Sequence, residues 1–172
     1  MFDIDITNDY ISGSSNAPHI LYLPTVLPET VVDSKDYIVL RFSSNGLGGL
    51  VVNIKGQNGS LNNGSQSIPS VNGDLDILTS GFGLRNLSVS NSSNYPTYLG
   101  SPNISSTPSD FTDSGPANKV GSPSISFVRL LDTSGLPVHN GRSAFVAKVK
   151  VSLNVEVGNF SEVLTVIPVS TF

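Results

Sequence analysis

Few residues in this chain have side chains that could carry acid–base chemistry. The two histidines, His19 and His139, are the only imidazole bases, and neither lies in a known catalytic motif. His19 lies in an apolar run typical of a strand, and His139 lies in a turn-like segment where we expect it to be solvated. The chain has no cysteine, which excludes a thiolate nucleophile, a disulfide framework and Cys-ligated metals. We therefore predict that the protein is not an enzyme and has no catalytic residue.

One short run could be read as part of a calcium site. Asn72, Asp74 and Asp76 alternate with other residues, as the first ligands of a calcium loop do. The further ligands and the closing glutamate of such a loop are missing, and a turn next to a strand explains the same residues. We predict no metal site and no cofactor.

A long polar segment, residues 91–124, contains the only plausible pair of aromatic residues for stacking on a sugar, Tyr95 and Tyr98. The alternative is that these tyrosines pin the segment to the rest of the protein. The segment is rich in Ser, Pro, Asn and Gly, so it cannot bury enough apolar surface to order itself alone. A loop of this length either carries a function, covers a partner, or is a plain surface excursion.

Composition and charge exclude several classes of partner. Charged residues make up 13% of the chain, about half the usual share, so its polar surface is mostly hydroxyl and amide groups. The net charge of −4 argues against binding to a nucleic-acid backbone. No stretch approaches the roughly 20 apolar residues of a membrane span. The first residues of the sequence lack the basic region and the apolar region of a signal peptide. We expect either a mature form whose leader has been removed or a protein used without secretion, such as a viral structural protein.

The hydrophobic pattern predicts strands throughout. Apolar residues alternate with period two, and Gly or Pro interrupts nearly every window long enough for a helix. Asn–Gly pairs, which favour tight hairpin turns, recur at Asn45, Asn58, Asn63, Asn72 and Asn140. The predicted fold is all-β: a single β-sandwich of about nine strands, immunoglobulin-like or jelly-roll, over residues 13–172, with residues 1–12 as an extended arm.

The C-terminal third shows the longest alternation. We expect one strand with a buried apolar face, a turn at Gly158–Asn159, and a second long strand over residues 160–172 that is apolar on both faces. The residues predicted on the buried face of the first strand are Val149, Val151, Leu153, Val155 and Val157.

The N-terminal arm has its own apolar stripe, followed by a predicted flexible hinge at residues 13–16. Such a strand can pair with a sheet edge of another subunit, where its backbone gives affinity and its side chains fill pockets. The alternative is an ordinary first strand within its own domain. The predicted donor-strand residues are Phe2, Ile4, Ile6 and Tyr10.

The segment Gly158–Val166 resembles the closing segment of chaperone–usher fimbrial subunits and spore-coat-U-like pilins. In that pattern Phe160 stands for the aromatic residue and Glu162 for the acid, and Phe172 for the terminal aromatic. Leu164 and Val166 stand for the inward residues of the last strand, which the resemblance places at the subunit interface. The resemblance implies an incomplete immunoglobulin-like sandwich that the N-terminal extension of the next subunit completes.

The function predicted from these features is structural. We expect a subunit that binds other copies of itself and forms an extracellular, cell-surface filament (a pilus or fimbria) by N-terminal strand exchange. One alternative is a virion protein (capsid, penton or decoration subunit) of the outer shell, with an exchanged N-terminal arm. A second alternative is a secreted sugar-binding or adhesin domain. No nucleic-acid contact and no membrane span are expected.

Overall fold

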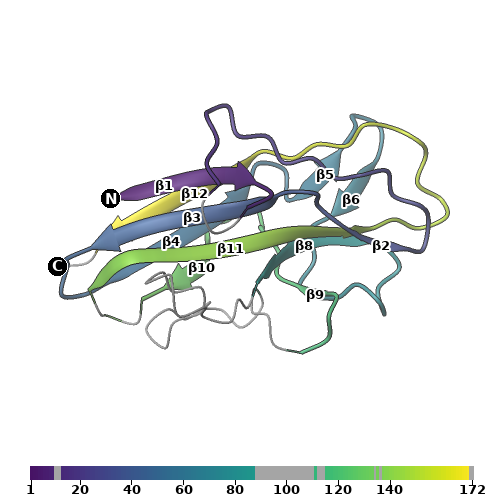
Figure 1. The fold of residues 1–172 in the computed structure, drawn as a ribbon. Coiled ribbons are helices and arrows are strands. Elements are labelled where there is room, and N and C mark those ends of the chain that lie inside the picture. Colours follow the sequence, from purple (N-terminus) through teal and green to yellow (C-terminus); the bar gives the residue numbers. More distant parts are fainter. Residues whose placement is uncertain (10–12, 88–110, 112–114, 134, 136, 171–172) are drawn as a thin grey trace.

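A computed structural model describes residues 1–9, 13–87, 111, 115–133, 135 and 137–170, and within these residues the fold is all-β (Figure 1). The described residues form twelve strands in four sheets, and every pair of strands is antiparallel. They contain no α-helix. The all-β prediction is confirmed, whereas nine strands in one sandwich are not.

The largest sheet has five strands. Its order is β1–β3–β11–β2, and β8 also pairs with β11, from Phe145 opposite Asn86 to Lys150 opposite Gly81. The strands are β1 (Phe2–Thr7), β2 (Val31–Asp33), β3 (Tyr37–Ser44), β8 (Gly81–Asn86) and β11 (Val138–Lys150). His139 therefore lies within a strand, where the sequence had predicted a turn.

The second sheet has three strands, in the order β10–β4–β12. These are β4 (Leu50–Gly56), β10 (Val128–Asp132) and β12 (Leu164–Ser170). Two small sheets pair β5 (Ser60–Asn62) with β6 (Ser67–Pro69), and β7 (Gly73–Asp74) with β9 (Lys119–Val120).

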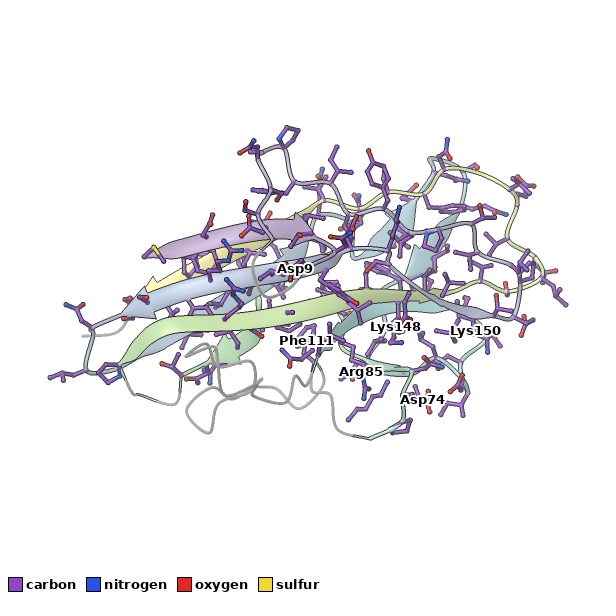
Figure 2. All side chains as sticks on the ribbon, in the orientation of Figure 1. Asp9, Asp74, Arg85, Phe111, Lys148 and Lys150 are labelled. Carbon is purple, nitrogen blue, oxygen red and sulfur yellow. The ribbon has the colours of Figure 1, made fainter. Side chains whose placement is uncertain are left out.

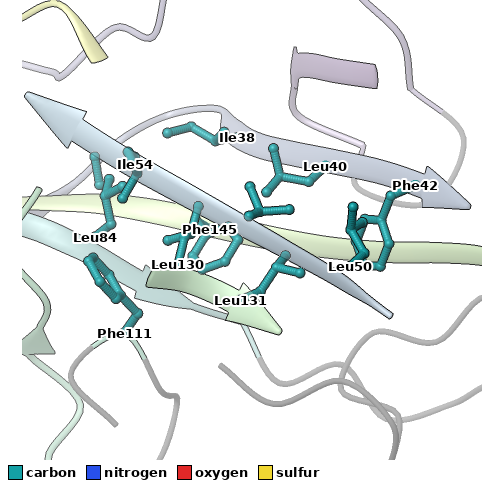
Figure 3. Close-up of a cluster of buried hydrophobic side chains, with 12 residues drawn as sticks. Ile38, Leu40, Phe42, Leu50, Ile54, Leu84, Phe111, Leu130, Leu131 and Phe145 are labelled. Carbon is teal, nitrogen blue, oxygen red and sulfur yellow. The ribbon is translucent and has the colours of Figure 1, made fainter. Parts of the chain in front are cut away.

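The two larger sheets share one hydrophobic core (Figure 3). Because successive strand residues point to opposite faces, β4 alternates between buried and half-buried positions along its whole length. Burying one such aliphatic or aromatic side chain contributes about 1.5–3 kcal/mol. The buried members of this core cluster are Ile38, Leu40, Phe42, Leu50, Val52, Ile54, Leu84, Phe111, Leu130, Leu131, Phe145 and Ala147.

The predicted C-terminal hairpin is wrong. Strand β11 ends at Lys150, opposite the first residues of both neighbouring strands, Gly81 and Val31, so beyond this point it has no strand to pair with. Val149 and Val151 are buried as predicted, but Leu153 is 75% exposed and Val157 fully exposed. Strand β12 then pairs with β4 in the other sheet, because the chain crosses between sheets over residues 151–163.

Candidate functional site

Strand β1 is the candidate donor strand, and it lies at an edge of the five-stranded sheet. It pairs with β3 over six residues, from Phe2 opposite Phe42 to Thr7 opposite Tyr37. The side chains of Phe2, Ile4 and Ile6 face inward and pack against the core cluster, so the predicted stripe does form one apolar face. Within this single chain β1 completes its own sheet. Tyr10 lies outside the described residues.

On the outer edge of β1, side chains accept hydrogen bonds from two backbone N–H groups. Met1 exchanges two backbone hydrogen bonds of 2.8 Å with Ser43. Because bonded pairs alternate along an antiparallel ladder, the backbone N–H and C=O groups of the odd-numbered residues of β1 point toward β3. The even-numbered N–H groups therefore point away from the sheet. The Ile4 N–H donates to Oδ1 of Asp3 at 3.0 Å, and the Ile6 N–H donates to Oγ of Ser15 at 2.8 Å.

A buried ion pair fastens β1 from its outer face. Asp5 is only 1% exposed, and its Oδ2 lies 3.3 Å from Nη1 of Arg41 on β3. The Ser15 N–H donates to Oδ1 of Asp5 at 2.7 Å, and Arg41 donates to the carbonyl of Gly13. We call Asp5, Gly13, Ser15 and Arg41 the N-terminal clasp. The segment predicted to be a hinge is thus hydrogen-bonded to the strand that it was predicted to release.

The clasp lies beside a second guanidinium group. Arg142 is opposite Arg41 in the sheet. Burial and the positive charge of Arg41 lower the pKa of Arg142, while Asp9 and Asp5 raise it. The two carboxylates therefore offset two neighbouring positive charges, and Asp5 lies in direct contact with Arg41.

His19 does not lie in the strand that its apolar neighbours predicted. It is exposed and lies outside any strand, and its Nδ1 is 3.0 Å from Oγ of Ser15. Its role in the structure is therefore contact with the clasp.

Strand β12 carries the predicted last-strand residues. Leu164 and Val166 pack against the same core cluster as β1, from the opposite sheet. Figure 1 shows β1 and β12 toward the same side of the molecule. The other face of β12 is open: Ile167 is 40% and Val169 44% exposed. The strand predicted to be buried on both faces is therefore buried on one face within this chain.

The predicted sugar-contact residues, Tyr95 and Tyr98, lie outside the described residues, as does Phe172. Of the polar segment 91–124, the described parts are integrated into the fold. Phe111 is 1% exposed within the core cluster, and Gly121 exchanges two backbone hydrogen bonds with Leu84 of β8. This part of the predicted loop is therefore a structural cover of the five-stranded sheet.

Three buried cations escaped the sequence analysis: Arg85, Lys148 and Lys150 are each at most 9% exposed (Figure 2). Lys148 Nζ lies 2.6 Å from Oδ1 of Asp33, and Lys150 Nζ donates to the Asp76 carbonyl at 3.3 Å. The alternation in β11 assigns both lysines to the polar face. It does not show that another segment covers that face.

The third cation, Arg85, donates hydrogen bonds to backbone carbonyls in residues 116–119. Arg85 Nη1 donates to the carbonyls of Pro116 at 2.7 Å and Lys119 at 3.0 Å. These contacts hold the residues around β7 and β9 against the sheet, which is a structural role.

The carboxylates of the calcium-like run have structural partners. Asp74 Oδ1 accepts a hydrogen bond from the backbone N–H of Asp76 at 3.1 Å, and Asp76 Oδ1 accepts one from Asn118 at 2.9 Å. Among the residues that the structure describes, no three His, Asp or Glu side chains are grouped so that they could hold a metal ion. None of the described segments is a helix long and apolar enough to cross a membrane.

Comparison of the chain with known protein families, curated proteins and solved structures found no match. The resemblance of Gly158–Val166 to fimbrial subunits therefore stays a prediction.

Proposed function

We propose that the protein is a non-enzymatic structural subunit with a β-sandwich fold, and that copies assemble into a filament by exchanging β1. The observation that carries this proposal is the position of β1. It is an edge strand that contributes to the core through one face, Phe2, Ile4 and Ile6. The described residues between β1 and β2 form no strand. An edge strand on such a connection can pair with the same site in another copy and make identical contacts.

In an exchanged pair, some contacts of the N-terminal clasp would form within the donated segment and others between that segment and the receiving copy. When the exchanged segment runs from β1 through Ser15, the bonds from Ser15 to Asp5 and from Ile6 to Ser15 stay within that segment. The contacts of Arg41 with Asp5 and Gly13 join the arm to β3. A receiving copy therefore recognises the arm through a buried charge pair in addition to the apolar stripe.

The first test compares the full chain with a form lacking residues 1–12, by size measurement and negative-stain imaging. Filaments from the full chain alone support exchange of β1. Monomers from both forms contradict it. Closed shells or rings would favour the virion alternative.

A charge-swap experiment identifies the strand that is exchanged. Asp5→Arg and Arg41→Asp each place like charges in the clasp of their own chain, so each variant alone should assemble poorly. Mixed together they should co-assemble with alternating copies, because each arm then meets an opposite charge in the other variant. A chain carrying both substitutions is the matched control, and it should assemble without a partner variant. Failure of the mixture, with the control assembling, would show that β1 is not exchanged.

A further inference from the structure

The two sides of β12 differ in their backbone hydrogen bonding. The Val163 carbonyl accepts from the Gln57 N–H at 2.9 Å, and Ser161 exchanges two backbone bonds with Asn62. Because backbone groups alternate in direction along a strand, the N–H and C=O groups of Thr165 and Ile167 point toward β4. Those of Leu164 and Val166 point to the other side. In the described part of the chain no strand pairs with β12 on that side.

The outward N–H groups of this edge differ from those of Ile4 and Ile6 on β1. On β1, Asp3 and Ser15 accept from the outward N–H groups. On β12, the outward N–H and C=O groups of Leu164 and Val166 have no such partner among the described residues. Pro168 has no N–H to offer, so the open run ends there. An unprotected sheet edge is a template for pairing with another strand.

The surface beside this edge fits a second copy of the chain. The exposed side chains next to it are apolar: Val163 is 59% exposed, and Ile167 and Val169 follow on the same face. Residues 163–170 contain no charged side chain, whereas β1 carries two aspartates and the chain has a net charge of −4. Two acidic copies can therefore meet along β12 without placing like charges opposite each other, a juxtaposition that destabilises strand pairs.

We propose that β12 pairs edge to edge and antiparallel with β12 of a second copy, around a two-fold axis at Thr165. In this register Leu164 lies opposite the partner's Val166, and the two such pairs exchange four backbone hydrogen bonds. Pro168 lies outside these pairs. Ile167 packs on the partner's Val163 at both ends of the contact, and the three-stranded sheets of the two copies form one continuous sheet.

This dimer contact is independent of the exchange of β1. It uses the other sheet and a strand that stays in its own chain. Either interface can therefore exist without the other, and the experiments can separate them.

Cysteine cross-linking of the full chain tests the contact directly, since the chain has no cysteine of its own. In the proposed register Thr165 lies opposite the same residue of the second copy, in a non-hydrogen-bonded antiparallel pair. Residues in such a pair have Cα atoms about 4.5 Å apart, which a disulfide can bridge. Thr165→Cys should therefore give a disulfide-linked dimer under mild oxidation. The control is Asn53→Cys, which lies on the same sheet face but one strand away from the edge, opposite Ile167 on β4. It should stay unlinked.

The outcomes separate this contact from the proposed filament. If Thr165→Cys links no more than Asn53→Cys, the β12 contact is wrong, even if filaments form. If Thr165→Cys links while imaging shows no filament, the β12 contact stands and the exchange of β1 falls.

A charge pair across the contact tests the register. Ile167→Lys and Val163→Glu should each lose the dimer, because each places a charge against an apolar partner. Mixing the two variants should restore dimers as heterodimers, because the register sets the new lysine opposite the new glutamate. Without such restoration, the register centred on Thr165 is overturned.

Discussion

Asp5 shows how much of the N-terminal strand depends on a single side chain. It is the most buried charged residue among those described, and it accepts from Ser15 while it pairs with Arg41. Asp5→Asn keeps an acceptor for Ser15 but removes the charge opposite Arg41. Because Arg41 is partly exposed, we expect a loss of about 2 kcal/mol in the free energy of unfolding, measured by chemical denaturation.

The matched control is Asp3→Asn on the same strand. Asp3 is exposed, so its substitution should change the free energy of unfolding by less than about 0.5 kcal/mol. If Asp5→Asn had the same free energy of unfolding as the unsubstituted chain, water would be solvating the Arg41 guanidinium in place of Asp5. The N-terminal clasp would then not hold β1.

At the residue scale, the sequence predicts which face of a strand a side chain lies on better than it predicts what covers that side chain. Alternation correctly places Phe2, Ile4 and Ile6 on one face. It cannot show that Asp5 is buried, because the cover over Asp5 comes from Ser15, ten residues along the chain. The same limit applies to Lys148, whose cover comes from another part of the fold.

At the scale of the elements, strand β11 ends at Lys150 although the sequence alternation continues to Val157. Val149 is 1% exposed and Val157 is fully exposed, although both continue the same sequence alternation. Val149→Ala should therefore cost about 2 kcal/mol of unfolding free energy, as removal of buried methyl groups does. Val157→Ala should change it by less than about 0.5 kcal/mol. Thermal or denaturant unfolding of the two variants measures both values, and equal losses would mean that β11 extends to Val157.

Strand length depends on partners as well as on pattern. The period-two alternation predicts where a strand is favourable, and it correctly indicates an all-β fold. Whether a strand forms depends on neighbouring strands that offer backbone hydrogen bonds, and the two strands beside β11 begin at Gly81 and Val31, opposite Lys150. Since both belong to distant parts of the chain, the end of β11 and the crossing to β12 could not be predicted from the local sequence.

At the scale of the whole molecule, net charge should govern assembly. Copies with a net charge of −4 repel each other at long range, and salt shortens the range of this repulsion from about 30 Å at 0.01 M to about 8 Å at 0.15 M. The Asp5–Arg41 pair is buried and is screened much less. We therefore expect salt to promote assembly several-fold, measured by light scattering.

The control for the effect of salt is the form lacking residues 1–12, whose scattering should not rise beyond that of a dimer paired through β12. Assembly that weakens as salt is added would contradict this prediction, and it would indicate attraction between oppositely charged surfaces of neighbouring copies.

The first and last described residues of the chain meet on consecutive residues of β3. The Met1 ammonium group donates to the Ser43 carbonyl and the Ser43 N–H donates to the Met1 carbonyl, each at 2.8 Å. Ser170 Oγ lies 3.1 Å from Ser44 Oγ. A short peptide linker could join these two points, so a circularly permuted chain with new ends in an exposed turn should keep the same sheets. Joined in this way, β1 could no longer leave its own copy without displacing β12, so permutation should block the exchange that we propose for β1.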